Sequence, residues 1–201
     1  MAAVTSRSQV QRSPLSDTKR KIMKTAAELF AGEGYGSVGT SQISEATGYG
    51  KGALYYHIRS KGDLLYDIMT IYLEDLLSEA RQILAEKRHV KERVYALSES
   101  ILRAVVEDKA EMTVCFREVH ALEDTRRRSV LRLHGAYLGI WRQVTDDAAR
   151  EGDFRPLDND ELKALMGMYF YSFLWIGNDR TADIPALAAK FSGIIMRACH
   201  A

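Results

Sequence analysis

The sequence is poor in the residue types that mark several classes of protein. Among 201 residues there are two cysteines and three prolines. Cys115 and Cys199 are too few and too far apart for a disulfide framework or a zinc site of two CxxC pairs, which fits a reducing cytoplasm. No run of about 18 uninterrupted apolar residues predicts a membrane span, and the opening stretch MAAVTSRSQVQRSPLS lacks the apolar core of a signal peptide. The sequence therefore predicts a cytoplasmic protein with a folded core.

Net charge is also small, +1 at pH 7, but the charges are unevenly distributed. Residues 1–61 carry nine Lys or Arg and four Asp or Glu, a net +5, whereas the remainder carries 19 and 23, a net −4. A basic N-terminal segment on a mildly acidic body indicates binding to a polyanion by the first and to another partner by the second. Residues 1–15 are polar without helical periodicity and are predicted to be a flexible arm, whose Arg7 and Arg12 either contact an anionic partner or have no role.

Stretches rich in Ala, Leu, Glu, Lys and Arg between scattered glycines predict an all-α fold. N-cap candidates are Ser16 or Asp17, Ser60, Asp158 or Asn159, and Asp183. Apolar residues at helical spacing predict helices over about 17–34, 38–47, 51–58, 61–86, 89–107, 109–122, 124–151 and 160–178, with a last helix from about 183. In helix 38–47, Val38, Ile43 and Ala46 are expected to face inward. Helix 160–178 is apolar nearly all round its axis, which predicts burial on more than one side.

The helices at 38–47 and 51–58 have the dimensions of a helix-turn-helix, because only the turn Gly48-Tyr49-Gly50 separates them. With Leu54 in the core, the second helix can turn a set of small, basic and aromatic side chains toward the major groove of DNA. These are Lys51, Gly52, Ala53, Tyr55 and Tyr56. His57 and Lys61 can reach the phosphates.

Two glycine patterns nearby suggest a nucleotide site but lack its context. Residues 34–39 match G-x-G-x-x-G, yet a helix precedes them where a dinucleotide-binding turn needs a strand. Gly50-Lys51 lacks the other residues of a P-loop. Neither pattern predicts a cofactor.

The run GYGSVGTSQISEATGYGKGALYYHIRSKGDL resembles the N-terminal signature of TetR-type (tetracycline-repressor-like) transcriptional regulators. The matching positions are Gly34, Tyr35, Ile43, Ala46, Gly48, Gly52, Leu54, Tyr55, His57, Lys61 and Leu64. The resemblance covers residues 17–66 and extends to the rest of the chain through length and helix count. It implies an N-terminal three-helix domain with the helix-turn-helix, residues 16–62. A six-helix C-terminal ligand-binding and dimerisation domain would follow, residues 63–201.

The resemblance also implies roles for individual residues. Thr40 and Ser41, at the start of the second helix, would contact DNA together with the recognition-helix residues named above, and His57 and Lys61 would contact backbone phosphates. Gly50 stands where a capping serine is usual, Gly39 where Ser or Thr is usual, and Ile58 replaces a common Phe. Glycine at an N-cap costs only a few tenths of a kcal/mol relative to Ser, so we expect an intact fold with some phosphate contacts missing.

The function that these features predict is a ligand-responsive repressor that binds a palindromic operator as a homodimer and is released by a small hydrophobic effector. Apolar stripes on the last two helices suggest the dimer interface, although such stripes also form intramolecular cores. These are Leu162, Leu165, Met166, Phe170, Leu187, Phe191, Ile194 and Ile195. Candidate groups for the effector pocket, each of which could equally be core, are Met112, Cys115, Phe116, His120, His134, Tyr137, Trp141, Tyr169, Phe173 and Trp175. The pattern EGDFRP, residues 151–156, resembles regulators of this family that respond to fatty acyl or steroid-derived acyl thioesters.

Three alternatives are weaker. An effector-independent structural DNA-binding protein would share the helix-turn-helix. An enzyme with His134 or His120 as base and Cys115 as nucleophile has support only from the residue types. A metal sensor is disfavoured because His120, His134 and the two cysteines show no ligand spacing.

Overall fold

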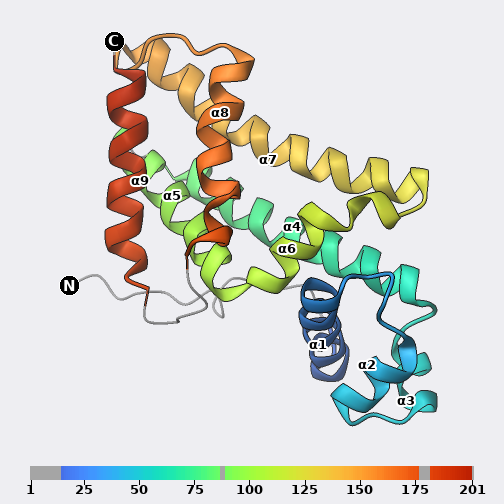
Figure 1. Ribbon diagram of the computed structural model, residues 1–201. Coiled ribbons are helices and arrows are strands. Elements are labelled where there is room, and N and C mark those ends of the chain that lie inside the picture. Colours follow the sequence, from blue (N-terminus) through green and yellow to red (C-terminus); the bar gives the residue numbers. More distant parts are fainter. Residues whose placement is uncertain (1–14, 87–88, 177–181, 201) are drawn as a thin grey trace. The chain divides into compact units, whose positions relative to one another are not determined.

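The computed structural model describes residues 15–86, 89–176 and 182–200. In these ranges the regular secondary structure is helical, apart from one isolated β-bridge between Phe154 and His200. The helices are α1 (Asp17–Glu33), α2 (Thr40–Thr47), α3 (Lys51–His57), α4 (Lys61–Ala85), α5 (Val90–Glu107), α6 (Lys109–Arg117), α7 (Asp124–Glu151), α8 (Asn159–Phe170) and α9 (Ile184–Cys199), with short 3-10 turns at Val119–Ala121 and Ser172–Leu174 (Figure 1). The all-α prediction is confirmed. The predicted arm falls outside the described residues, apart from Leu15.

The predicted helix starts coincide with observed N-caps. Ser16 accepts a hydrogen bond from the Lys19 amide, and Asp183 accepts one from the Ala186 amide. Asp158 forms a full capping box with Glu161. These side chains satisfy amides that the first turn of a helix leaves without a partner, so local sequence fixes where these helices begin. None of the described helices has the length and apolar character that crossing a membrane requires.

The chain divides into two compact units. The first comprises the described residues up to Asp75 together with Ala110–Leu131, and the second comprises Leu76–Lys109 and the residues from Arg132 onward. Helices α4 and α7 each begin in the first unit and continue into the second. The compact units divide α4 after Asp75. They do not test where the DNA-binding and ligand-binding functions divide, so the boundary after residue 62 stays a prediction.

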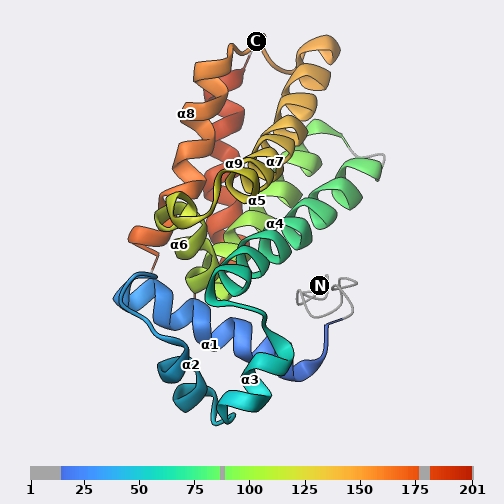
Figure 2. The same cartoon turned by 90° about the vertical axis from the view of Figure 1, so that its right-hand side faces the viewer.

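In the first unit, α1 packs against α2 and α3, and Figure 2 shows the three helices gathered together. Their shared core is fully buried: Ile22, Ala26 and Phe30 from α1, Ile43 from α2 and Leu54 from α3. Most of these residues stand at the helical spacing read from the sequence. The core holds α3 from one side only and leaves its other face to solvent.

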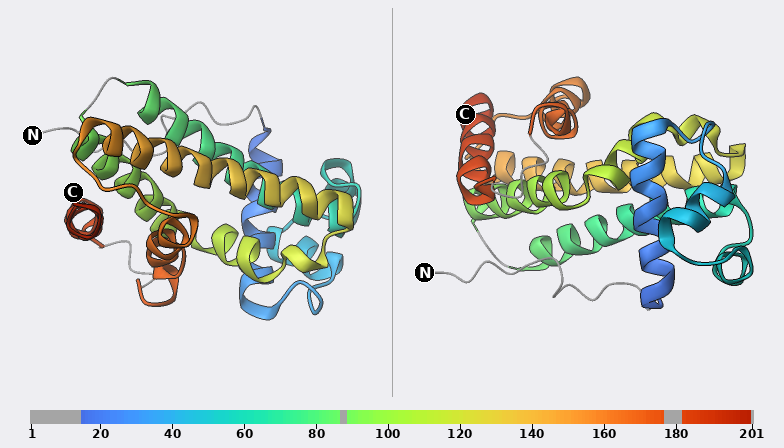
Figure 3. Two further views of the ribbon diagram at one scale, coloured as in Figure 1. Left: turned by 90° about the horizontal axis from the view of Figure 1, so that it is seen from above. Right: turned by 60° about the horizontal axis from the view of Figure 1, so that its bottom comes forward.

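In the second unit, α5 packs along α9 and also contacts α8. In Figure 3 (left) helix α9, coloured red, is seen end-on. Helix α5 is buried through most of its length, including Ser98, Ser100 and Arg103. Rings from three further helices contact one another, Trp141 of α7, Tyr169 of α8 and Phe191 of α9. We call these three rings the aromatic interior.

Several expected helix boundaries were wrong, and so was one of the three residues expected to face inward in helix 38–47. Helix α2 begins at Thr40, so Val38 is buried ahead of the helix, and Ala46 is exposed. The helix expected over 109–122 ends at Arg117 and is followed by a 3-10 turn.

The helix expected over 160–178 ends at Phe170. The Ser172 hydroxyl donates to the Tyr169 carbonyl (2.7 Å), which favours the tight turn that follows. Tyr171, Leu174 and Trp175 are 60–65% exposed, so the all-round burial expected here is not found within one chain.

Candidate functional sites

The turn between α2 and α3 is fixed by one glycine and by three side-chain hydrogen bonds. Gly48 adopts a left-handed conformation (φ 74°) and ends α2, a backbone geometry that favours glycine. The Ser44 hydroxyl donates to the Tyr49 carbonyl, and the Thr47 hydroxyl donates to Ile43 (2.8 Å) and accepts from the Tyr49 amide (3.4 Å). The angle between the two helices is therefore set locally.

Helix α3 presents one apolar residue inward and a mixed face outward. Leu54 is fully buried, whereas Tyr55 is 51% and Tyr56 86% exposed. Lys51, Gly52 and Ala53 are exposed as well. A short helix with this face has the size and chemistry of an element that enters the DNA major groove.

Two contacts orient the tyrosines of α3. The Tyr55 hydroxyl lies 3.1 Å from the Thr40 hydroxyl, at the first residue of α2. The Tyr56 ring meets the His57 ring edge-on, with centroids 5.1 Å apart. Ser41, beside Thr40, is exposed, and His57 is partly exposed. The structure thus brings the expected contact residues of α2 and α3 onto neighbouring surfaces of one unit, while their contact with DNA stays a prediction.

Lys61 differs from the other expected contact residues. Its ammonium donates to the carbonyls of Tyr35 and Val38, both at 2.9 Å, and lies 4.2 Å from the centroid of the Tyr35 ring. An ammonium has three donors, and two of them are used by these carbonyls. Lys61 therefore ties the start of α4 to the segment between α1 and α2, which does not support the phosphate role expected from the sequence.

The start of α4 is also tied to α7 within the first unit. Ser60 caps the helix by accepting from the Asp63 amide (3.0 Å), and Arg126 of α7 forms an ion pair with Asp63. The Ser60 hydroxyl, which donates to the Asp63 carboxylate, and the Arg126 guanidinium together hold the pKa of Asp63 below its usual range. Arg126 also lies over the Tyr66 ring. Sequence reasoning missed Arg126, because nothing local marks a partner that stands 63 residues away.

The expected effector residues do not form one group. Met112 and Cys115 are buried in the first unit, but Phe116 is 37% exposed and His120 is exposed. In the second unit Tyr137, Trp141, Tyr169 and Phe173 are buried, His134 is partly buried and Trp175 is 63% exposed. His120 and Trp175 therefore do not belong to the interior of the single chain. Phe116 was expected inward, but it stands next to the end of α6, where the helical stripe stops.

The centre of the aromatic interior is a hydrogen-bonded pair. The Ser98 hydroxyl of α5 donates to the Val94 carbonyl and lies 2.6 Å from the Tyr169 hydroxyl. Since Ser98 has a single proton, Tyr169 is the donor in this pair. The rings of Trp141 and Phe191 lie 5.4 and 5.2 Å from that of Tyr169. Burial raises the pKa of Tyr169 and lowers the pKa of His134, so both groups are held neutral near pH 7.

Half of the residues expected at a dimer interface are already buried in the single chain. Leu162, Met166, Phe191 and Ile195 are each 5% exposed or less, which removes them from a surface that a second copy could cover. Leu165, Phe170 and Leu187 are partly exposed and Ile194 is 41% exposed. The apolar stripes on α8 and α9 thus serve mainly the intramolecular core.

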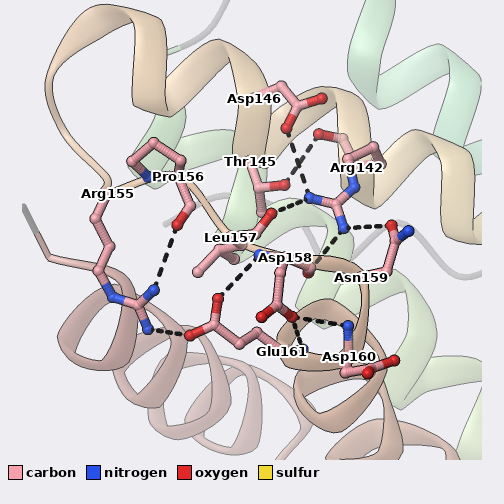
Figure 4. A network of polar contacts seen from close by, with 10 residues as sticks. All are labelled: Arg142, Thr145, Asp146, Arg155, Pro156, Leu157, Asp158, Asn159, Asp160 and Glu161. Carbon is pink, nitrogen blue, oxygen red and sulfur yellow. Dashed lines mark hydrogen bonds and ion pairs between the residues drawn. The ribbon is translucent and has the colours of Figure 1, made fainter.

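Residues of the EGDFRP segment make contacts within the chain, and Figure 4 draws those of Arg155 and Pro156. Phe154 is buried and pairs with His200, and the Arg155 amide donates to the Cys199 carbonyl (2.9 Å). The Arg155 guanidinium pairs with Glu161 at 2.7 Å. Arg142 donates to the carbonyls of Leu157 and Asp158, as Figure 4 shows. This segment lies in the connection between α7 and α8, and its contacts hold that connection against the end of α9.

An all-α protein with this helix-turn-helix belongs to the class of DNA-binding proteins. Residues 22–68 match the family described as "Bacterial regulatory proteins, tetR family", and residues 87–199 match "Tetracyclin repressor-like, C-terminal domain". The second match alone spans more than half of the chain, so the protein belongs to the TetR family of transcriptional regulators, a family of regulators rather than enzymes.

Individual relatives are distant in sequence. The HTH-type transcriptional repressor KstR2 of Rhodococcus jostii is 23% identical over 184 residues, covering 90% of each chain. The structure of the ketosteroid transcriptional regulator KstR2 of Mycobacterium tuberculosis superposes with a TM-score of 0.85 at 20% identity over 94% of this chain and 98% of that one. AibR, in complex with isovaleryl coenzyme A and operator DNA, gives a TM-score of 0.77 at 22% identity over 89% of this chain and 97% of that one. These structural similarities establish the fold.

Proposed function

We propose that this protein is a ligand-responsive transcriptional repressor that binds a palindromic operator as a homodimer and is released by a small hydrophobic effector. The observation that carries the DNA-binding part is the face of α3, where Leu54 is buried and the phenols of Tyr55 and Tyr56 lie in solvent. Thr40, Ser41, Lys51, Gly52, Ala53 and His57 complete the proposed DNA surface. Action on chromosomal DNA would place the protein in the cytoplasm.

A homodimer is proposed because one helix-turn-helix reads few base pairs. Two copies related by a two-fold axis present their recognition helices to half-sites one helical turn, about 34 Å, or a multiple of it apart. The exposed apolar residues of the second unit, Tyr171, Leu174, Trp175 and Ile194, support this proposal. They offer a surface for the second copy in place of the four side chains that the core already buries.

An acyl thioester is the effector class that we propose. The aromatic interior of the second unit is apolar with a few hydroxyl and N–H groups, the mixture found in sites for small molecules. Among the relatives, AibR has been crystallised with isovaleryl coenzyme A and KstR2 is described as a ketosteroid regulator. An effector that binds the DNA-free state more tightly by about 1–3 kcal/mol would weaken operator binding roughly 5- to 150-fold.

The test begins with the operator. Genomic fragments that the protein retains would be sequenced, and a labelled duplex from them titrated at several salt concentrations. We expect tight binding to one pseudo-palindrome with steep salt dependence. Equal affinity for any duplex would instead favour the effector-independent structural protein.

Two variants sharpen that test. Tyr56→Ala should cost about 1–3 kcal/mol in operator binding and alter sequence preference. Lys51→Met should weaken operator binding, whereas Lys190→Met, which removes the same charge from an exposed position on α9, should have no effect. Unchanged operator binding by Tyr56→Ala and Lys51→Met would contradict the proposed DNA surface.

A further inference from the structure

The Trp141 indole has a buried polar group without a partner. Trp141 is 1% exposed, and its Nε1 has no hydrogen-bonding partner in the structure. Buried N–H groups are nearly always hydrogen-bonded, so this one calls for a physical explanation. The indole nitrogen can only donate, which means that its missing partner must be an acceptor.

The neighbouring hydroxyls leave the indole donor unsatisfied. The Ser98 hydroxyl gives its proton to the Val94 carbonyl, and the Tyr169 hydroxyl gives its proton to Ser98. The Trp141 ring lies against the Tyr169 ring, which in turn lies against Phe191. In the second unit, aromatic surface therefore adjoins a donor that none of the described residues satisfies.

The surroundings of Trp141 favour neutral groups. Burial raises the pKa of the Tyr169 hydroxyl and lowers the pKa of the His134 imidazole, which stands on the same face of α7 two turns before Trp141. Both shifts indicate a poorly solvated environment that disfavours either sign of charge. Transfer from water to this environment would cost an ionised carboxylate far more free energy than a neutral carbonyl that gains a hydrogen bond.

We propose that Trp141 Nε1 donates a hydrogen bond to a carbonyl oxygen of the effector, whose apolar body packs against the aromatic interior. The proposal rests on the proposed function and deepens it, because it specifies a neutral carbonyl group of the effector and the atom that recognises it. A ligand of the same shape without the carbonyl would leave the indole unsatisfied and bind more weakly.

The experiment pairs one substitution with one change in the ligand. Trp141→Phe removes the donor and keeps an aromatic ring. The probes are isovaleryl-, octanoyl- and palmitoyl-coenzyme A, each matched with the S-alkyl thioether of coenzyme A that lacks only the carbonyl oxygen. Dissociation constants are measured by calorimetry, and release of labelled operator by fluorescence anisotropy.

We expect Trp141→Phe to weaken binding of the preferred acyl thioester roughly 3- to 10-fold. The same substitution should leave binding of the thioether unchanged, because the thioether has no carbonyl oxygen that could accept the hydrogen bond from Trp141. Tyr66→Phe is the matched control, because it removes an aromatic hydrogen-bond donor of the first unit, the hydroxyl that donates to Ser129, and should leave both affinities unchanged.

A spectroscopic readout guards against a variant that merely folds badly. The chain has two tryptophans, so the indole N–H signal that Trp141→Phe loses from a nitrogen-15 spectrum identifies the signal of Trp141 in the wild type. Binding of the acyl thioester should move that signal downfield as the hydrogen bond forms, and the thioether should not.

The outcomes separate this inference from the proposed function. If acyl thioesters release the operator equally from the wild type and Trp141→Phe, the inference is overturned and the proposed function stands. If the indole signal stays in place while the operator is released, the inference is likewise overturned. If no probe changes operator binding or the indole signal, both the acyl-thioester effector and the donor role fail, while operator binding by α3 is unaffected.

Discussion

Helix α3 and the aromatic interior place similar side chains in opposite situations. Tyr56 of α3 is 86% exposed, and the Tyr55 hydroxyl has the Thr40 hydroxyl as a partner in solvent. Tyr169 and Trp141 are buried, and among the described residues the Tyr169 hydroxyl has a hydrogen-bonding partner whereas the Trp141 indole N–H has none. The first region offers hydrogen-bonding groups that water satisfies until a partner replaces it, which suits a hydrated polyanion. The second region buries its hydrogen-bonding groups away from water, which suits an apolar molecule with one hydrogen-bond acceptor.

The strongest way to break this comparison is to remove the residue that anchors α3. Leu54→Ala should destabilise the first unit by about 2–5 kcal/mol, because the side chain is fully buried and the cavity collapses only in part. Both tryptophans lie in the second unit, so tryptophan fluorescence reports that unit alone, whereas circular dichroism reports the helices of both units.

We expect helix loss by circular dichroism to precede the fluorescence change as Leu54→Ala is heated. Leu131→Ala is the control, since Leu131 is 51% exposed and its loss should alter stability by less than about 0.5 kcal/mol. Coincident transitions in Leu54→Ala would show that the two regions unfold together.

Lys61 and Lys51 separate folding from binding within the first unit. Lys61→Met leaves the carbonyls of Tyr35 and Val38 without their donor and should cost about 1–3 kcal/mol in urea unfolding. Lys51→Met should leave unfolding unchanged and weaken operator binding. If Lys61→Met instead kept full stability and reduced the salt dependence of operator binding, the phosphate role expected from the sequence would be restored.

Asp63 gives the first unit an acid-sensitive contact. Its pKa is lowered in the folded protein, so the stabilisation is present above the unfolded pKa of about 3.9 and is lost as pH falls through the folded value. Asp63→Asn should remove this contribution. Urea midpoints measured from pH 7 to about pH 3 should therefore fall less steeply in Asp63→Asn than in the wild type, and parallel curves would contradict the assignment.

The smallest expected effect concerns the glycine that precedes α3. Gly50→Ser supplies an N-cap hydroxyl, and a Cβ there meets nothing within 4 Å, so we expect a gain of a few tenths of a kcal/mol by thermal unfolding. Gly48→Ser is the matched control and should destabilise, because residue 48 has φ of 74°. A loss of stability in Gly50→Ser would mean that the start of α3 needs glycine.

Much of the fold could be predicted from the sequence because local signals fix it. Ser16, Asp158 and Asp183 each cap the helix predicted to follow, and the stripe containing Ile22, Ala26 and Phe30 faces the core as its spacing requires. The end of α8 was missed because no glycine or proline stands between Phe170, where the helix ends, and Gly177. A single serine hydroxyl at residue 172 favours the turn instead.

The site was predictable where a motif specifies it and not where a distant partner does. The exposed face of α3 follows from Leu54 alone, since one buried residue orients a short helix. The bonds of Lys61 to Tyr35 and Val38, and of Arg126 to Asp63, join segments far apart in the chain. The unsatisfied indole of Trp141 depends on how α5, α7 and α8 pack, which periodicity does not show.

The engagement of the Lys61 ammonium has a chemical consequence. An ammonium that donates to two carbonyls gives up those bonds as well as a proton before its nitrogen can attack an electrophile, whereas an ammonium in open water has only to lose the proton. Brief treatment with an acylating reagent should therefore label Lys51 well before Lys61. Mass spectrometry of the digested protein would then record the difference between the two lysines in the unaltered sequence.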